Sequence, residues 1–174
     1  MKTILVVLSA AVLAGCATPA AVEKMAVSLP ITQTNPALKN SVGVADVTGG
    51  RETNPMWTSQ VSSDAFRRAL EQSLENAGMF SKIVAGSKYQ LTADLTRLDQ
   101  PVLGFDMTVT STVRYALIET QTRKELYARV IQIGYTASMS DAFIGSQRLK
   151  LANEGAVKAN IQAFINDLVA LKLP

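Results

Sequence analysis

Residues 105–118 have the sequence Phe-Asp-Met-Thr-Val-Thr-Ser-Thr-Val-Arg-Tyr-Ala-Leu-Ile, in which apolar and polar side chains alternate. Because successive side chains of a strand point to opposite faces, this alternation predicts a strand with one buried face and one wet face. The apolar parity carries Met107, Val109, Val113, Tyr115 and Leu117. The other parity is rich in threonine. The stretch therefore predicts a sheet that is covered on one side only.

Two further segments flank this one and repeat the pattern. Residues 89–97 alternate cleanly, and residues 124–138 do so less regularly. The link from Glu119 to Arg123 is short enough for the last two strands to form an antiparallel hairpin. The three segments together predict consecutive strands of a mostly antiparallel sheet.

One more strand and two helices complete the predicted domain. Residues 42–47 predict a first strand, and residues 58–77 carry apolar side chains at helical spacing, with Gly78 as the stop signal. A last helix is predicted over residues 149–171, where Gly155 suits a close contact between helix and sheet. The fold class is thus α+β, in the order β-α-β-β-β-α. Its two helices are expected to pack on one face of a small, mostly antiparallel sheet.

The composition limits the chemistry that this 174-residue chain can perform. It contains one cysteine and no histidine, which excludes Ser-His-Asp and Cys-His catalytic sites and Cys/His zinc sites. Its formal net charge is +3, without a cluster of basic residues, so nucleic acid is not an expected partner. We expect a protein that is not an enzyme, with no catalytic residues, no metal ligands and no cofactor.

Two groups of residues resemble functional motifs but have simpler structural explanations. Gly49-Gly50 lies between a strand and a helix without the lysine of a phosphate-binding loop, so an ordinary turn is expected. Asp94, Asp99 and Asp106 lie near one strand connection, where two carboxylates could serve a glycosidase. Asp94 and Asp106 fall on the polar parity of their strands, so exposed acids are the simpler expectation.

Three features are candidates for contact with a partner. Trp57, the only tryptophan, either caps the core or anchors a partner at the junction between loop and helix. Phe143, in the polar loop of residues 139–147, belongs either to a tucked lid or to an interaction tip. The threonine-rich face is either solvated or a flat surface for a partner or a second copy. Trp57 and Phe143 are therefore the candidate partner contacts, and a homo-oligomer remains open.

The first residues indicate how the protein is located. Lys2 precedes an apolar run from Ile4 to Leu13, which is too short to span a membrane and is typical of a secretory signal. The run ends in Leu13-Ala14-Gly15-Cys16, which resembles the lipobox of bacterial lipoproteins. The resemblance implies that the Cys16 sulfur is linked to lipid and that Cys16 becomes the first residue of the mature chain. The acyl chains on Cys16 are then the expected membrane attachment.

The expected organisation has three parts. Residues 1–15 are a lipoprotein signal peptide, residues 16–40 contain the lipidated cysteine and a flexible tether, and residues 41–172 form a single α+β domain. Ala17 follows the lipidated cysteine. In the sorting rule of enteric bacteria, Asp at this place favours retention in the inner membrane. By that resemblance, Ala17 implies a lipid-anchored protein on the periplasmic face of the outer membrane.

The order and spacing of the elements resemble a broad group of small bacterial envelope lipoproteins. The resemblance rests on core positions: residues 42–47, Phe66-x3-Leu70-x3-Leu74, residues 78–80, residues 89–93 and Asn160-Ile161-x2-Phe164. Relatives by architecture include the TolB amino-terminal domain, the curli-assembly lipoprotein CsgG, the penicillin-binding-protein activator LpoB, YajG-type lipoproteins and PqiC.

The resemblance implies a non-catalytic structural or accessory module in envelope assembly or maintenance, acting through protein–protein contacts. The alternative is a carrier of a lipid or another apolar ligand, accessory to an envelope transport system. An apolar cavity open to solvent would favour the carrier, and a filled core with an exposed apolar patch would favour the partner-binding module.

The lipobox assignment predicts the outcome of replacing Cys16→Ser. Without the thiol that accepts lipid, the chain should stay an uncleaved, unacylated precursor. Mass spectrometry of the membrane fraction measures both properties. Normal cleavage of this variant would refute the assignment.

Overall fold

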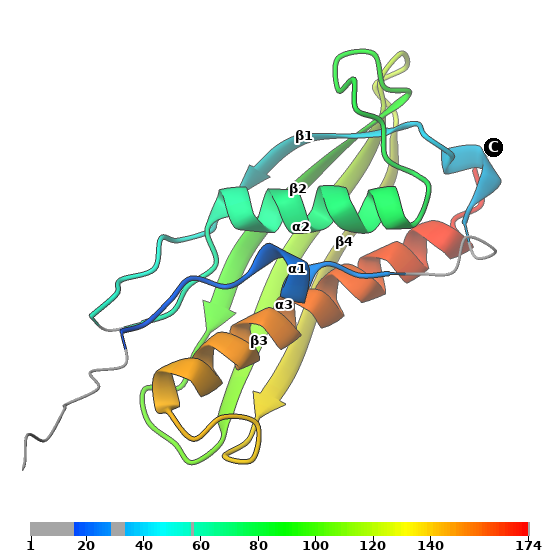
Figure 1. The fold of residues 1–174 in the computed structure, drawn as a ribbon. Coiled ribbons are helices and arrows are strands. Elements are labelled where there is room, and N and C mark those ends of the chain that lie inside the picture. Colours follow the sequence, from blue (N-terminus) through cyan, green and yellow to red (C-terminus); the bar gives the residue numbers. More distant parts are fainter. Residues whose placement is uncertain (1–15, 29–33, 57, 174) are drawn as a thin grey trace, which may run out of the picture.

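The computed structural model describes residues 16–28, 34–56 and 58–173 (Figure 1). The main elements are β1 (Val42–Thr48), α2 (Ser63–Asn76), β2 (Tyr89–Asp99), β3 (Met107–Glu119), β4 (Glu125–Ala137) and α3 (Gly145–Ala170). Two short turns of helix precede them, α1 (Val22–Met25) and η2 (Pro36–Leu38). This order confirms the α+β class and the β-α-β-β-β-α succession expected from the sequence.

The four strands form one sheet in the order β1-β2-β3-β4. β1 runs parallel to β2, and the pairs β2–β3 and β3–β4 are antiparallel, which confirms the predicted hairpin. Both long helices lie on the same side of the sheet (Figure 1). The helices therefore form one layer and the sheet the other, with the core between them.

Side-chain alternation sorts the strand residues between the core and water. In β3, Val109, Val113, Tyr115 and Leu117 are fully buried, whereas their neighbours on the other parity are exposed or half-buried. β4 is an edge strand and buries only Ile131 and Ala137. Its weaker burial explains why its sequence alternates less regularly than that of β3.

Helix α2 begins five residues later than the apolar spacing predicts. The side chain of Ser62 accepts a hydrogen bond from the Ala65 N–H and caps the helix, which starts at Ser63. Before the cap, Asn54 and Thr58 pair in a short bridge. The helix ends before Gly78, whose φ of +68° lies in the left-handed region, as expected of a stop signal.

Helix α3 is fixed to the sheet by a buried polar residue, Asn160. Its Nδ2 donates to the Ile131 oxygen at 2.9 Å and to the Ser111 oxygen at 3.1 Å, and its Oδ1 accepts from the Tyr115 hydroxyl at 3.0 Å. The ring of Tyr115 stacks on Phe164 of the same helix, with ring centroids 4.1 Å apart. Burial also raises the pKa of the Tyr115 hydroxyl, which keeps it neutral as a donor.

The described residues of the expected tether pack on the domain. Met25 and Val27 are buried, the Val27 N–H donates to the Ser73 hydroxyl at 3.0 Å, and Asn76 donates to the Val27 oxygen. Further along, the Asn35 side chain donates to the Leu168 and Leu171 oxygens at the end of α3. Small and apolar side chains let this segment fit against α2 and α3. It therefore contributes to the core instead of standing apart as a flexible spacer.

Replacing Asn160→Ala should destabilise the protein by about 3 kcal/mol, because it leaves a cavity and removes partners of three buried groups. Thermal unfolding should show a melting temperature lower by roughly 10 °C. Asn166→Ala, at an exposed position of the same helix, is the control and should change stability little. Equal effects of the two variants would show that Asn160 does not fix α3 to the sheet.

Candidate functional surfaces

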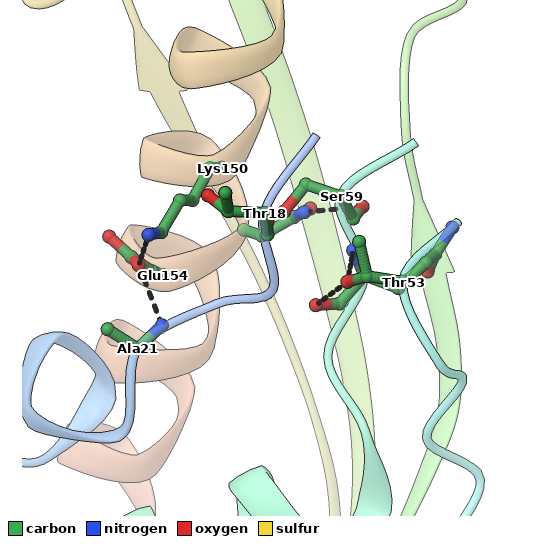
Figure 2. Close-up of polar contacts among 8 residues, drawn as sticks. Thr18, Ala21, Thr53, Ser59, Lys150 and Glu154 are labelled. Carbon is green, nitrogen blue, oxygen red and sulfur yellow. Dashed lines mark hydrogen bonds and ion pairs between the residues drawn. The ribbon is translucent and has the colours of Figure 1, made fainter. Parts of the chain in front are cut away.

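Cys16 is exposed at the edge of the domain, and the chain is held from the next residue onward. The Ala17 N–H donates to the Pro55 oxygen at 2.8 Å, and the Ser59 hydroxyl donates to the Thr18 oxygen at 2.7 Å. Figure 2 shows the contact between Ser59 and Thr18. The N-terminal end of the described chain is thus attached to the loop that precedes α2, with no free spacer after Cys16.

A second attachment joins this segment to α3. The Ala21 N–H donates to Glu154 Oε1 at 2.8 Å, and Lys150 lies 3.9 Å from the same oxygen (Figure 2). Glu154 is only 3% exposed. Burial raises the pKa of its carboxyl, an effect that the Ala21 N–H and the charge of Lys150 oppose. Glu154 therefore holds the segment through a hydrogen bond, at some cost for burying its charge.

A buried polar network connects the attached segment to Asn153 of α3 and to the loop after β2. The Ser59 oxygen accepts from Gln100 Nε2 and from Asn153 Nδ2, both at 2.9 Å. Gln100 also donates to Asn153 Oδ1 at 2.7 Å. Ser59 contacts Thr18 on one side and this pair on the other. Residues 17–28, which we call the anchor segment, thus meet α3 and the β2–β3 loop at one end of the molecule.

Two loops with exposed apolar side chains lie at this same end, away from the β3–β4 hairpin (Figure 1). The β2–β3 loop carries Val102, Leu103 and Phe105, which are 92%, 88% and 79% exposed. The β4–α3 loop carries Phe143, which is 84% exposed. Phe143 is therefore at a protruding tip and not in a tucked lid. Trp57, the other candidate contact, lies outside the described residues.

Arg148 of α3 ties the two loops together. Its guanidinium donates to the Ala142 and Phe143 oxygens at 2.8 and 2.7 Å and, more weakly, to the Gly104 oxygen at 3.4 Å. Asp141 orders the same loop by accepting hydrogen bonds from the Ser138 N–H and hydroxyl, which lower the pKa of the Asp141 carboxyl. The apolar tips are therefore presented by loops that have internal support.

A hollow of about 480 Å³ lies between the two loops. Its lining residues are Leu103, Gly104, Phe105, Met139 and Arg148. Arg148 is only 6% exposed and has no acidic partner among the described residues. The hollow thus combines apolar walls with one buried positive charge.

A separate groove of about 550 Å³ runs between α3 and the end of β4. Its floor forms where the Tyr135 ring lies on Gly155: a Cβ at Gly155 would be 2.3 Å from the ring. This confirms the close helix–sheet contact expected at Gly155. Leu151 and Ala159 add apolar walls, and Lys158 lies at its rim. The groove is open to solvent and separate from the core.

The remaining motifs have structural explanations. Asp94 accepts from the Thr48 hydroxyl at 2.9 Å, and Asp99 lies 3.5 Å from Arg97, so the acids are engaged separately. The Gly50 N–H donates to the Ser63 hydroxyl, and a Cβ on Gly50 would lie 2.1 Å from the Ser63 N. The turn thus fills the space at the start of α2 that a phosphate would need. Within the described ranges, no group of three or more acids, cysteines or histidines could hold a metal.

On the outer face of the sheet, β3 carries Thr108, Thr110 and Thr112 next to Arg114. No helix covers this face in Figure 1. Thr108 and Thr136 share a hydrogen bond of 2.8 Å between their hydroxyls across β3 and β4. Val130, Gln132 and Gly134 continue the exposed surface along β4. In the described part of the chain, no strand pairs with the outer edge of β4, and no helix is long and apolar enough to span a membrane.

Comparison with solved structures identifies proteins of the same fold. Protein XCC0632 from Xanthomonas campestris, of family DUF330, has a TM-score of 0.56 and 14% identity over 79% of this chain and 90% of that one. A minor lipoprotein from Acinetobacter baumannii has a TM-score of 0.53 and 13% identity over 78% and 94% of the two chains. Protein CT253 from Chlamydia trachomatis has a TM-score of 0.53 and 10% identity over 77% and 99%.

The likeness to these structures is one of fold, which agrees with the broad lipoprotein-like architecture inferred from the sequence. None of the three descriptions names a catalytic activity. No protein-family model matches the sequence, and no curated protein matches it.

The contact between Ala21 and Glu154 predicts a selective effect of replacing Glu154→Ala. Loss of the acceptor should release the anchor segment. Amides of residues 17–28 should then exchange with solvent faster than in the wild type, whereas amides of β3 should exchange at the same rate in both proteins. The expected loss of stability is about 1–3 kcal/mol. Unchanged exchange over residues 17–28 would contradict this role of Glu154.

Glu154→Gln is the matched control, because its amide oxygen can still accept from Ala21. The raised pKa of Glu154 means that its carboxylate form is disfavoured in the folded state, so the wild type loses stability as pH rises through that pKa. The free energy of unfolding of the Gln variant should therefore increase relative to that of the wild type between acidic and neutral pH.

Proposed function

We propose that the chain is a lipoprotein of the outer membrane, held on its periplasmic face by acyl chains on Cys16. It acts as a non-catalytic accessory module in envelope assembly or maintenance by binding another envelope protein. The lipobox-like sequence before Cys16 supports the anchor. The exposed position of Cys16 at the edge of the domain is compatible with a lipid attached to its sulfur.

The uncovered face and edge of β4 are the observation that supports a protein partner. β4 has 13 residues and is the outermost strand, and small uncharged side chains line its outer face. A long free edge can accept another strand through backbone hydrogen bonds, and a flat face of small side chains allows close approach. A second copy of this chain is the alternative occupant of this surface.

The experiment is photo-crosslinking in cells from an amino acid placed at Gln132, on the exposed face of β4. The matched control is Gln72, an exposed glutamine of α2 on the helical side. Mass spectrometry should identify a specific envelope protein, or this chain itself, crosslinked from Gln132 and not from Gln72. If both positions crosslink the same abundant proteins, the proposed partner surface is wrong.

The groove between α3 and β4 favours a second candidate function, that of a carrier for a lipid or another apolar ligand in envelope transport. About 550 Å³ with apolar walls is within the range of small-ligand sites, although this groove is open. Replacing Ala159→Phe would fill it. Native mass spectrometry should then show a lipid on the wild type and not on this variant. An unliganded wild type would remove the carrier from consideration.

A further inference from the structure

The end of the domain that carries Cys16 also carries its most exposed apolar side chains. In addition to Leu103, Phe105 and Phe143, Met56 is 84% exposed at the turn that receives the Ala17 N–H through Pro55. Large apolar side chains grouped on a surface indicate contact with another apolar phase. Burying each of them fully is worth roughly 1.5–3 kcal/mol.

The position of the anchor determines which apolar phase is within reach. Because Ala17 and Thr18 are hydrogen-bonded to the domain, the Cys16 backbone can be only about one residue length, some 3.5 Å, from this attachment. A lipid on the Cys16 sulfur therefore draws this end of the domain, and not the β3–β4 hairpin at the other end, toward the bilayer. The short connection leaves no spacer that could hold the loops away from lipid.

We infer that the β2–β3 and β4–α3 loops are a membrane-contacting surface, with the tips formed by Leu103, Phe105 and Phe143 inserted into the interface of the bilayer. This inference rests on the proposed lipid anchor at Cys16. The occupant of the surface is the lipid of the membrane in which the anchor lies. Apolar side chains that are buried at the boundary between headgroups and acyl chains bind a protein to the membrane, with a strength that scales with the buried apolar area.

The charge behind the tips fits the same occupant. Arg148 lies at the hollow between the loops, where its guanidinium holds three backbone oxygens but no carboxylate among the described residues. Phospholipid phosphates lie just outside the acyl region, so apolar tips in front of a positive charge match the order of apolar and anionic layers in a bilayer. The surface thereby orients the domain, with the outer face of the sheet left accessible.

The test measures the depth of single positions in the mature, lipidated protein reconstituted in vesicles. In that protein the Cys16 sulfur is blocked by lipid, so an introduced cysteine is the only free thiol. Leu103→Cys and Phe143→Cys place a fluorescent label, NBD, on the two tips. Gln121→Cys, in the β3–β4 hairpin, and Gln132→Cys, on the outer sheet face, are exposed controls.

The vesicles contain phosphatidylethanolamine, phosphatidylglycerol and a fraction of lipid with nitroxide on the acyl chain. Labels at residues 103 and 143 should lose most of their fluorescence to the nitroxide quencher, whereas labels at residues 121 and 132 should keep theirs. Equal quenching at all four positions overturns the inference. Tip labels that stay unquenched overturn it as well. Since no other protein is present, that result is expected of a surface that binds a protein partner instead of lipid.

Two measurements on the same samples separate this inference from the lipid anchor itself. The intact mass reports the acyl chains on Cys16, and flotation with the vesicles reports attachment. Protein without acyl chains refutes the proposed anchor. Protein that is acylated and floats, but whose tip labels stay unquenched, refutes the membrane-contacting loops alone.

Discussion

The hydrogen bonds of Asn160 set the position of α3 on the sheet, and much of the molecule depends on that position. One amide satisfies Ile131 on β4, Ser111 on β3 and the Tyr115 hydroxyl, so neither sliding nor rotating the helix preserves all three contacts. Apolar packing alone tolerates such shifts more easily. With the middle of α3 fixed, two residues of its N-terminal half reach their partners: Glu154 contacts the anchor segment, and Arg148 contacts the two loops.

The segment after Cys16 would give the proposed lipid anchor an orienting role. A long free tether would let a domain sample many orientations relative to the bilayer. Here the chain is hydrogen-bonded to the domain from Ala17 onward, and the side chains of Met25 and Val27 are buried in it. An anchor attached through so short a connection restricts the orientations that the whole domain can take relative to the bilayer. With the proposed anchor in a bilayer, one end of the domain would face lipid, and the exposed face of β4 would stay accessible to other envelope proteins.

The elements of the fold were predictable because their signals are local. Alternation in β3 and helical spacing in α2 each follow from one buried face. The start of α2 was misplaced because Val61 continues the apolar spacing beyond the helix, although the capping residue Ser62 marked the true start. The burial of Asn160 and Arg148 was not predictable, since their partners are distant in sequence or are backbone oxygens of loops. For Phe143 the sequence left two alternatives, and its exposure in the structure, with Arg148 bound to the backbone of its loop, shows that it points outward.

The attachment of the N-terminal segment to α3 has a consequence for the order of folding. Ala21 and Glu154 are 133 residues apart, as are Asn35 and Leu168. Closing so long a loop costs entropy that is recovered only once α3 has formed. If the chain is exported as proposed, α3 is the last of the described main elements to leave the translocation channel. Under that proposal, the residues beside Cys16 would stay unstructured until α3 has been exported, which would leave time for enzymes at the membrane to process them before the domain closes over its own beginning.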